Sequence, residues 1–285
     1  MHIHHLNCGC MCPWGGALFD GYSPGLTATV PCHCLLVETE RDGLVLVDTG
    51  FGYNDIQHPQ RLSRFFRLFN NIRLDHRLTA LDQIRRLGFD PRDVRHIVLT
   101  HLDFDHAGGL EDFPQARVHV MGEEISHATQ AGGWIGSRRY RARQWQAVAD
   151  WEFYPGLGEQ WFGFDAVRAL IDVQDDILLV PLGGHTHGHA GIALRTGQGW
   201  LLHAGDAYFH HLEVHSPQRR CPPGMRLYQR MMDTDHKLRL ANQRRLRDLV
   251  LTQGPGLEVF CSHDRWEMQY ALTNQQEKDA RCQRA

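Results

Sequence analysis

Residues 100–109 read Thr-His-Leu-Asp-Phe-Asp-His-Ala-Gly-Gly and follow the apolar run Val94–Leu99. Four of these side chains can ligate a metal ion, namely His101, Asp103, Asp105 and His106. Burying two imidazoles and two carboxylates so close together is unfavourable unless a cation balances them, and the glycines allow backbone and solvent to approach that cation. The stretch therefore predicts a metal-binding loop at the carboxyl end of a buried strand.

Three further candidate ligands follow other predicted strands, at residues 177–180, 200–202 and 257–261. They are His185, Asp206 and His263. A single buried histidine is usually a hydrogen-bonded core residue, but imidazoles and carboxylates at the ends of four strands favour a metal site. Seven protein ligands suit two metal ions that share one bridging carboxylate.

The rest of the chain alternates short apolar runs with amphipathic segments. Further strands are expected at residues 1–7, 26–37, 44–47, 116–121 and 192–194, and helices at residues 79–87, 123–129 and 235–251. Asp264 is expected to cap a short helix, because Glu267 three residues later completes a capping-box pattern. The tripeptide Gly197-Gln198-Gly199 is expected to join two strands as a hairpin.

Two segments leave alternatives open. Residues 54–77 fit either a mobile flap over a pocket or an amphipathic surface helix. Residues 132–164 are rich in aromatic side chains and arginines, which favours an inserted cap that lines a substrate pocket. The alternative is a helical excursion whose aromatic side chains bury one another. We expect one domain over residues 1–285, with the cap inserted at about 132–164.

Composition limits the partners and the compartment. The formal net charge of −3 argues against a nucleic-acid or anionic-membrane surface, so a small-molecule substrate is expected. Five of the eight cysteines lie in the first 34 residues, with no export signal and no apolar run long enough for a membrane span. The sequence therefore predicts a cytoplasmic protein with mostly free thiols, and it leaves a homodimer open.

At this point the chain resembles the metallo-β-lactamase superfamily. The resemblance rests on Asp48 in Val-Asp-Thr-Gly, on residues 101–106 and 184–189, on Asp206 in Ala-Gly-Asp-Ala, and on His263 in Ser-His-Asp. These motifs follow the family's order and span most of the chain. The resemblance implies an α/β protein with an αβ/βα four-layer sandwich, in which two mixed β-sheets are flanked by helices and a dinuclear site lies at one edge.

The resemblance also implies a role for each motif residue. His101, residue 103 and His185 would hold the first metal ion, and Asp105, His106 and His263 the second, with Asp206 bridging them. Three other residues would support the ligands through hydrogen bonds, namely Asp48, His189 and His203.

Asp103 departs from the family pattern, which has histidine at this position. Three carboxylates with two divalent ions leave a net charge of about +1 instead of +2, and a carboxylate is a harder ligand than imidazole. Two divalent ions are expected, zinc first, with iron or manganese as alternatives at the Asp103 position. If Asp103 does not bind, the first position is weak or empty.

The expected activity is hydrolysis of a small ester-type substrate by a metal-activated water, with Asp105 or Asp103 handling its proton. Within the family, the His-Ala-Gly-Gly and Ser-His-Asp stretches are most similar to the quorum-quenching lactonases, so a lactone is the first substrate expected. Tyr208 is a candidate substrate contact. The alternatives are a thioester hydrolase, an iron-dependent redox enzyme such as a persulfide dioxygenase, and a metal-binding protein without activity.

Overall fold

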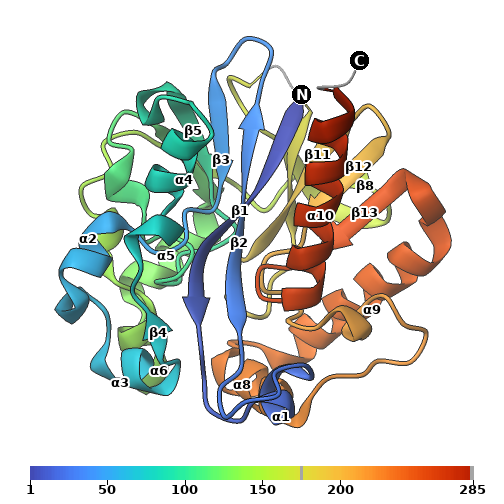
Figure 1. The fold of residues 1–285 in the computed structure, drawn as a ribbon. Coiled ribbons are helices and arrows are strands. Elements are labelled where there is room, and N and C mark those ends of the chain that lie inside the picture. Colours follow the sequence, from blue (N-terminus) through green and yellow to red (C-terminus); the bar gives the residue numbers. More distant parts are fainter. Residues whose placement is uncertain (174–175, 283–285) are drawn as a thin grey trace.

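The computed structural model describes residues 1–173 and 176–282. Two β-sheets pack face to face, and helices cover the outer face of each sheet (Figure 1). The seven-stranded sheet has the order β4-β1-β2-β3-β5-β6-β7, and the six-stranded sheet has the order β13-β12-β11-β10-β9-β8. The predicted four-layer sandwich is confirmed.

The seven-stranded sheet combines an antiparallel and a parallel half. Its strands are β1 (His2–Met11), β2 (Val30–Glu38), β3 (Leu44–Val47), β4 (Ile72–Arg73), β5 (Val94–Val98), β6 (Arg117–Met121) and β7 (Trp151–Tyr154). β1 pairs antiparallel with β2 and β4, and β2 pairs antiparallel with β3. From β3 through β5 and β6 to β7 the pairing is parallel.

The six-stranded sheet is antiparallel except at one edge. Its strands are β8 (Glu159–Trp161), β9 (Phe164–Ala169), β10 (Ile177–Pro181), β11 (Ala190–Thr196), β12 (Gly199–His203) and β13 (Leu257–Phe260). The expected hairpin forms between β11 and β12, and β13 pairs parallel with β12. As a result, β12 and β13 both deliver their following loops to the same edge.

The longer helices cover the sheets on both sides (Figure 1). The helices are α1 (Ala17–Asp20), α2 (Tyr53–Gln57), α3 (Arg64–Phe69), α4 (Ala80–Arg86), α5 (Gly122–Gln130), α6 (Gly133–Arg139), α7 (Ala142–Trp145), α8 (Pro223–Met232), α9 (His236–Gln253) and α10 (Arg265–Cys282). Ile84 of α4 and Ala128 of α5 pack on the seven-stranded sheet, and Leu246 of α9 packs on the six-stranded sheet. In the part of the chain that the structure describes, no helix could span a membrane.

The central core lies between the two sheets. Val47 and Val98 from one sheet share an apolar cluster with Leu179 and Ile192 from the other, and all four side chains are fully buried. β3 and β5 lie between this cluster and the outer helices, so both of their faces are covered. This explains why β3 reads as a continuous apolar run, whereas β5 is apolar only at Val94 and from Ile97 to Val98.

The two ambiguous segments resolve differently. Residues 54–77 form α2, α3, short turns and the edge strand β4, which is closer to the surface-helix alternative. The segment 132–164 is not one inserted cap, because only α6 and α7 lie outside the sheets, whereas β7 and β8 are integral strands. Its aromatic density reflects core packing in part, since Tyr154 and Phe164 are only 2% and 1% exposed.

Gly52 marks a close approach between the chain that follows β3 and the metal-binding loop. A Cβ atom on Gly52 would lie 2.0 Å from the carbonyl oxygen of Gly108. We therefore expect Gly52→Ala to lower the free energy of unfolding by about 1–3 kcal/mol through overpacking. Urea denaturation measures this effect. Gly25→Ala is the matched control, because a Cβ there meets nothing within 4 Å; equal stability of the two variants would contradict the prediction.

Candidate metal centre

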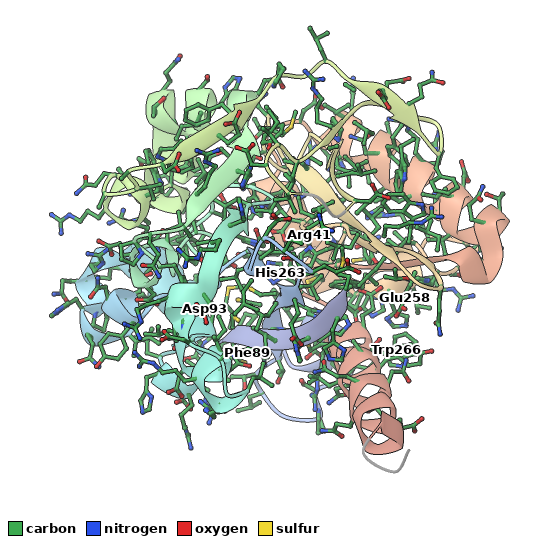
Figure 2. All side chains as sticks on the ribbon, turned by 90° about the horizontal axis from the view of Figure 1, so that it is seen from above. Arg41, Phe89, Asp93, Glu258, His263 and Trp266 are labelled. Atoms are coloured by element: carbon green, nitrogen blue, oxygen red, sulfur yellow. The ribbon has the colours of Figure 1, made fainter. Side chains whose placement is uncertain are left out.

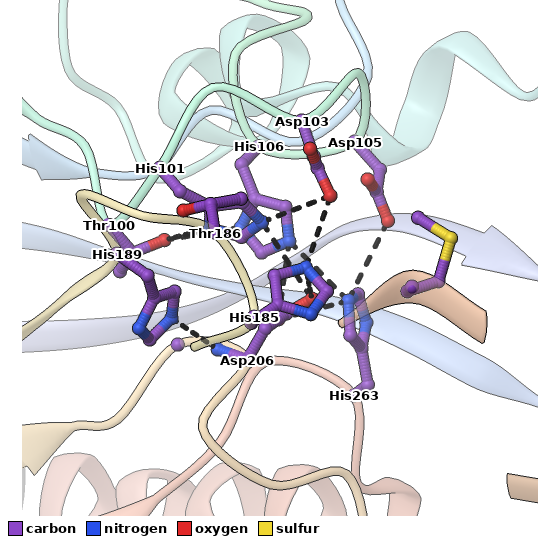
Figure 3. A network of polar contacts seen from close by, with 12 residues as sticks. Thr100, His101, Asp103, Asp105, His106, His185, Thr186, His189, Asp206 and His263 are labelled. Atoms are coloured by element: carbon purple, nitrogen blue, oxygen red, sulfur yellow. Dashed lines mark hydrogen bonds and ion pairs between the residues drawn. The ribbon is translucent and has the colours of Figure 1, made fainter. Parts of the chain in front are cut away.

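The seven expected ligands converge at one edge of the sandwich, although they come from four separate loops (Figure 3). Each is no more than 5% exposed. The loops follow β5, β10, β12 and β13, whose carboxyl ends meet at this edge. Seen along the sandwich, His263 lies near the middle of the molecule (Figure 2). Because all seven side chains are buried, the charges of the site are shielded from bulk water.

Asp206 turns one carboxylate oxygen toward each of two groups of donors. Its Oδ2 atom lies 3.7 Å from Nε2 of His101 and 3.3 Å from Nε2 of His185. Its Oδ1 atom lies 3.4 Å from Nε2 of His106 and 3.2 Å from Nε2 of His263. This is the arrangement expected for a carboxylate that bridges two metal positions.

The remaining carboxylate of the second group is Asp105. Its Oδ2 atom lies 3.6 Å from Nε2 of His263. Cys32 also approaches this group, since its Sγ lies within 4.8 Å of the nearest ligand atoms of Asp105 and His263. Burial keeps the pKa of the Cys32 thiol well above its ordinary value, so the free protein holds it protonated. Seven of the cysteines, Cys32 among them, are free thiols, as the sequence indicates.

Two atoms of the cluster test whether a metal ion fits. Nε2 of His101 and Oδ1 of Asp206 are buried without a hydrogen-bond partner. Burying such an atom without a hydrogen-bond partner costs about 1–3 kcal/mol. The nitrogen lone pairs and the carboxylate oxygens of the cluster converge on common points. A divalent cation at each point satisfies them, so the donor sets fit two ions: His101, His185 and Asp206 at a first position, and His106, His263, Asp105 and Asp206 at a second.

Hydrogen bonds from behind hold several ligands in orientation. Asp48 accepts hydrogen bonds from the backbone N–H and hydroxyl of Thr100 at 2.8 and 2.7 Å, and from Nδ1 of His106 at 2.7 Å. Burial raises the pKa of Asp48, but the facing His106 more than offsets this and lowers the pKa below its ordinary value. Asp48 therefore stays ionised, and it leaves Nε2 of His106 free for a metal ion. Its φ of 55° lies in the left-handed region, a strain that these hydrogen bonds offset.

His189 and His203 also have supporting positions. Nε2 of His189 accepts the backbone N–H of Asp206 at 2.8 Å, and its Nδ1 donates to the carbonyl oxygen of Leu182. Nε2 of His203 donates to the carbonyl oxygen of His33 at 2.6 Å, and its Nδ1 accepts the backbone N–H of Gly205. Both rings use both nitrogens, so they fix the loop around Asp206 and have no lone pair left for a metal ion.

Asp103 has a partner that the sequence reasoning missed. Arg139, the last residue of α6, forms a two-point ion pair with it: Nε lies 2.6 Å from Oδ1 and Nη2 lies 2.5 Å from Oδ2. Nη2 also donates to Nε2 of His185 at 2.8 Å. Burial raises the pKa of Asp103, but the neighbouring guanidinium reverses this and keeps the pKa well below its ordinary value.

Sequence reasoning had little means of finding Arg139. It is one of four arginines in a short stretch, with Arg138, Arg141 and Arg143, and no motif distinguishes them. Only the fold shows that Arg139 is 2% exposed and points inward. The one usable signal was Asp103 itself, because a carboxylate in place of imidazole calls for a balancing cation.

Tyr208 does not lie with the ligands. Its hydroxyl donates to Glu267 at 2.8 Å, and its ring packs with Leu246 and Val259 in the cluster under α9. The expectation that it contacts substrate is corrected, because the residue two positions after Asp206 already points into this core. One tyrosine near the site is Tyr228 of α8, whose hydroxyl accepts from Nδ2 of Asn70 at 3.2 Å.

Tyr228 is influenced directly by the charges of the site. Burial is the main reason why the pKa of its phenol is well above the ordinary value, and the nearby carboxylate of Asp105 raises it further. The phenol therefore keeps its proton. Its ring lies 5.9 Å from that of Phe209, which in turn lies 4.8 Å from the imidazole of His263. No motif marks α8, so this residue could not be recognised from the sequence.

A two-sheet sandwich with paired donor sets at the strand ends defines the class of metal-dependent hydrolases with a dinuclear site. Comparison with known proteins agrees: the chain belongs to the metallo-β-lactamase superfamily, whose family model matches residues 27–260. A probable metallo-hydrolase of Mycobacterium tuberculosis is 40% identical over 92% of this chain and 80% of its own length. An N-acyl homoserine lactonase of Bacillus cereus is 26% identical over 85% of this chain and 84% of its own.

Solved structures show the same fold. An N-acyl homoserine lactone hydrolase with the product N-hexanoyl-L-homoserine at its metal centre superposes with a TM-score of 0.68, at 21% identity, covering 94% of this chain and 95% of the other. A dizinc quorum-quenching lactonase, AidC, gives a TM-score of 0.61 at 19% identity, covering 93% and 87% of the two chains.

Asp48 provides a test of the ligand support. In Asp48→Asn the charged acceptor behind His106 is lost, and the amide can present its N–H₂ to the ring. We expect the affinity for the Zn²⁺ ion at the position of His106 to fall about 10- to 100-fold. Titration of chelator-stripped protein against a chromophoric chelator measures this. Asp150→Asn, which removes an exposed partner of Arg117, is the control; equal affinities in both variants would refute the role of Asp48.

Proposed function

We propose that the protein hydrolyses lactones that carry an apolar acyl chain, with zinc at its metal positions and the cytoplasm as its compartment. The observation that carries this proposal is the apolar, aromatic wall beside the donors. Phe209 lies 5.9 Å from the ring of His185 and 4.8 Å from that of His263, and it belongs to a cluster with Phe66, Phe104 and Tyr228. Such a wall suits an uncharged ester better than a phosphate or nucleotide.

A series of ring contacts leads from this wall to the surface. Tyr228 lies 6.1 Å from Phe69, Phe69 lies 5.3 Å from Phe65, and Phe65 lies 4.5 Å from Trp134. Phe69 is 40% exposed and Trp134 is 52% exposed. The series joins α3 and α6, in the two segments for which a flap and a cap were expected. We propose that it receives the acyl chain of the substrate.

The acid and base roles belong to two different residues of the chain. Metal ions bound at such donors act as Lewis acids and bring the pKa of a bound water toward ~7. Asp103 is paired with Arg139, so Asp105 is the carboxylate available to accept a proton. Burial raises the pKa of Asp105 above its ordinary value, which makes it a better base. Tyr228 holds a phenolic proton that can be donated to the ester oxygen.

The iron-dependent alternative loses its main argument. It depended on an extra negative charge at Asp103, which Arg139 balances. A thioester hydrolase uses the same chemistry as a lactonase and differs in the shape of its substrate. A comparison of substrates therefore distinguishes these two activities. The lactonase names among the relatives and solved structures support the lactone.

A substrate panel tests the proposal. Zn²⁺-loaded protein is assayed with N-acyl homoserine lactones of increasing acyl length, the matched open-chain methyl esters, an acyl thioester and a phosphodiester. We expect ring opening, followed by mass spectrometry, with kcat/KM rising as the acyl chain lengthens. Preference for the thioester, or no turnover of any lactone by protein that binds two ions, would refute it. Oxygen consumption with a persulfide would favour the redox alternative.

Two tyrosine variants distinguish a tyrosine that acts at the site from one that packs in the core. Tyr228→Phe should lower kcat/KM for the favoured lactone about 100-fold, because a hydrogen-bond donor to the developing oxyanion is lost. Tyr208→Phe should leave kcat/KM nearly unchanged and cost about 1 kcal/mol of stability, because its hydroxyl donates to the buried Glu267. Steady-state kinetics and urea unfolding measure both. The reverse pattern would restore Tyr208 as the substrate contact.

A further inference from the structure

We propose that Arg139 is a positioning residue of the first metal position. Arg139 and Asp103 form an ion pair with no net charge, and this pair stands in place of the neutral imidazole of the family pattern. The guanidinium of Arg139 makes the first position bind its ion more weakly than the second position does. This difference in metal binding does not depend on the identity of the substrate.

The contacts of Arg139 fix its guanidinium in one orientation. Nε and Nη2 meet the two oxygens of Asp103, and Nη1 donates to the carbonyl oxygens of Met232 at 2.7 Å and His185 at 3.3 Å. A planar fork held at both ends is the strongest form of a charge-assisted hydrogen bond. Because Arg139 and Asp103 are each 2% exposed, neither charge can find water as a substitute partner.

The charge balance supports reading the pair as one unit. With Asp103, Asp105 and Asp206 as carboxylates, two divalent ions would leave a single net positive charge. Arg139 returns the net charge to the value that imidazole at residue 103 would give. The Asp103–Arg139 pair is therefore neutral overall, as the imidazole of a histidine would be. Oδ2 of Asp103 lies 3.4 Å from Nε2 of His101.

The same contacts make the two metal positions unequal. Nη2 of Arg139 donates to Nε2 of His185, and the lone pair that accepts this hydrogen bond is the one that a metal ion needs. A metal ion at the first position must displace this hydrogen bond and tolerate a fixed cation beside it. The ligands of the second position are held instead by Asp48 behind His106 and by the carbonyl oxygen of Pro31 behind His263, at 2.7 Å in each case. The second position should therefore fill first.

The test is a Zn²⁺ titration of chelator-stripped protein against a chromophoric chelator. Wild type should bind two ions with affinities at least tenfold apart. Arg139→Gln removes the competing cation and frees Asp103, so the weaker affinity should rise at least tenfold. The thermal midpoint of the metal-free variant should fall, and Zn²⁺ should raise it by more than in wild type, because the ion then balances a buried carboxylate.

Arg239→Gln is the matched control. Arg239 is also buried, at 1% exposure, and forms an ion pair with Asp233 in which Nε lies 2.6 Å from Oδ1. Its loss should destabilise the protein while leaving two unequal Zn²⁺ affinities as in wild type. If Arg139→Gln keeps the wild-type affinities, or weakens both, Arg139 has only a structural role and the proposal is overturned.

A double variant keeps the test decisive if Arg139→Gln alone does not fold. Asp103→His with Arg139→Gln restores the family pattern and leaves no unpaired buried charge. It should fold without metal and bind two Zn²⁺ ions with affinities within about tenfold of each other. Persistence of the wild-type gap in this variant would show that the inequality arises elsewhere, which would also overturn the proposal.

Discussion

The carboxylate of Asp206, placed between His185 on one side and His263 on the other, is the interaction on which the rest of the site depends. It lies 3.3 and 3.2 Å from their Nε2 atoms through different oxygens. Asp206 reaches both because its loop leaves β12 at the edge where the other ligand loops also lie. His189 then has to hold the backbone of this loop, and the parallel pairing of β12 with β13 has to bring His263 beside it. The order of the strands, the hydrogen bonds to this loop and the positions of the ligands therefore depend on one another.

Charge is balanced locally throughout this region. Asp48 faces His106, Asp103 faces Arg139, and Asp206 faces the histidines of both positions. Asp105 lies 3.6 Å from His263, and burial raises the pKa of its carboxyl above the ordinary value. This difference from the other carboxylates supports the proposal that Asp105 acts as the base.

The sequence was informative where function depends on residues close together in the chain or directly after an apolar run. It picked out seven candidate ligands that the structure brings together, because strand ends are recognisable from local pattern. It could not predict Arg139 or Tyr228, which reach the site from helices through tertiary packing. It misplaced Tyr208 because spacing along the chain does not say which way a side chain turns after a strand. Aromatic density around residue 150 was read as a cap, although β7 and β8 use several of those rings to fill the sheets.

The separation of the ligands along the chain has a consequence for biosynthesis. The metal-binding loop at residues 101–106 leaves the ribosome long before His263, and β13 has to pair with β12 before that histidine can reach its partners. Domains of this kind fold as a unit once their last strand is available. A complete centre therefore cannot form before β13 and His263 have left the ribosome and paired with the rest of the fold. Any fragment that stops before β13 retains the motif at residues 101–106 but lacks His263, one of the four donors of the second position.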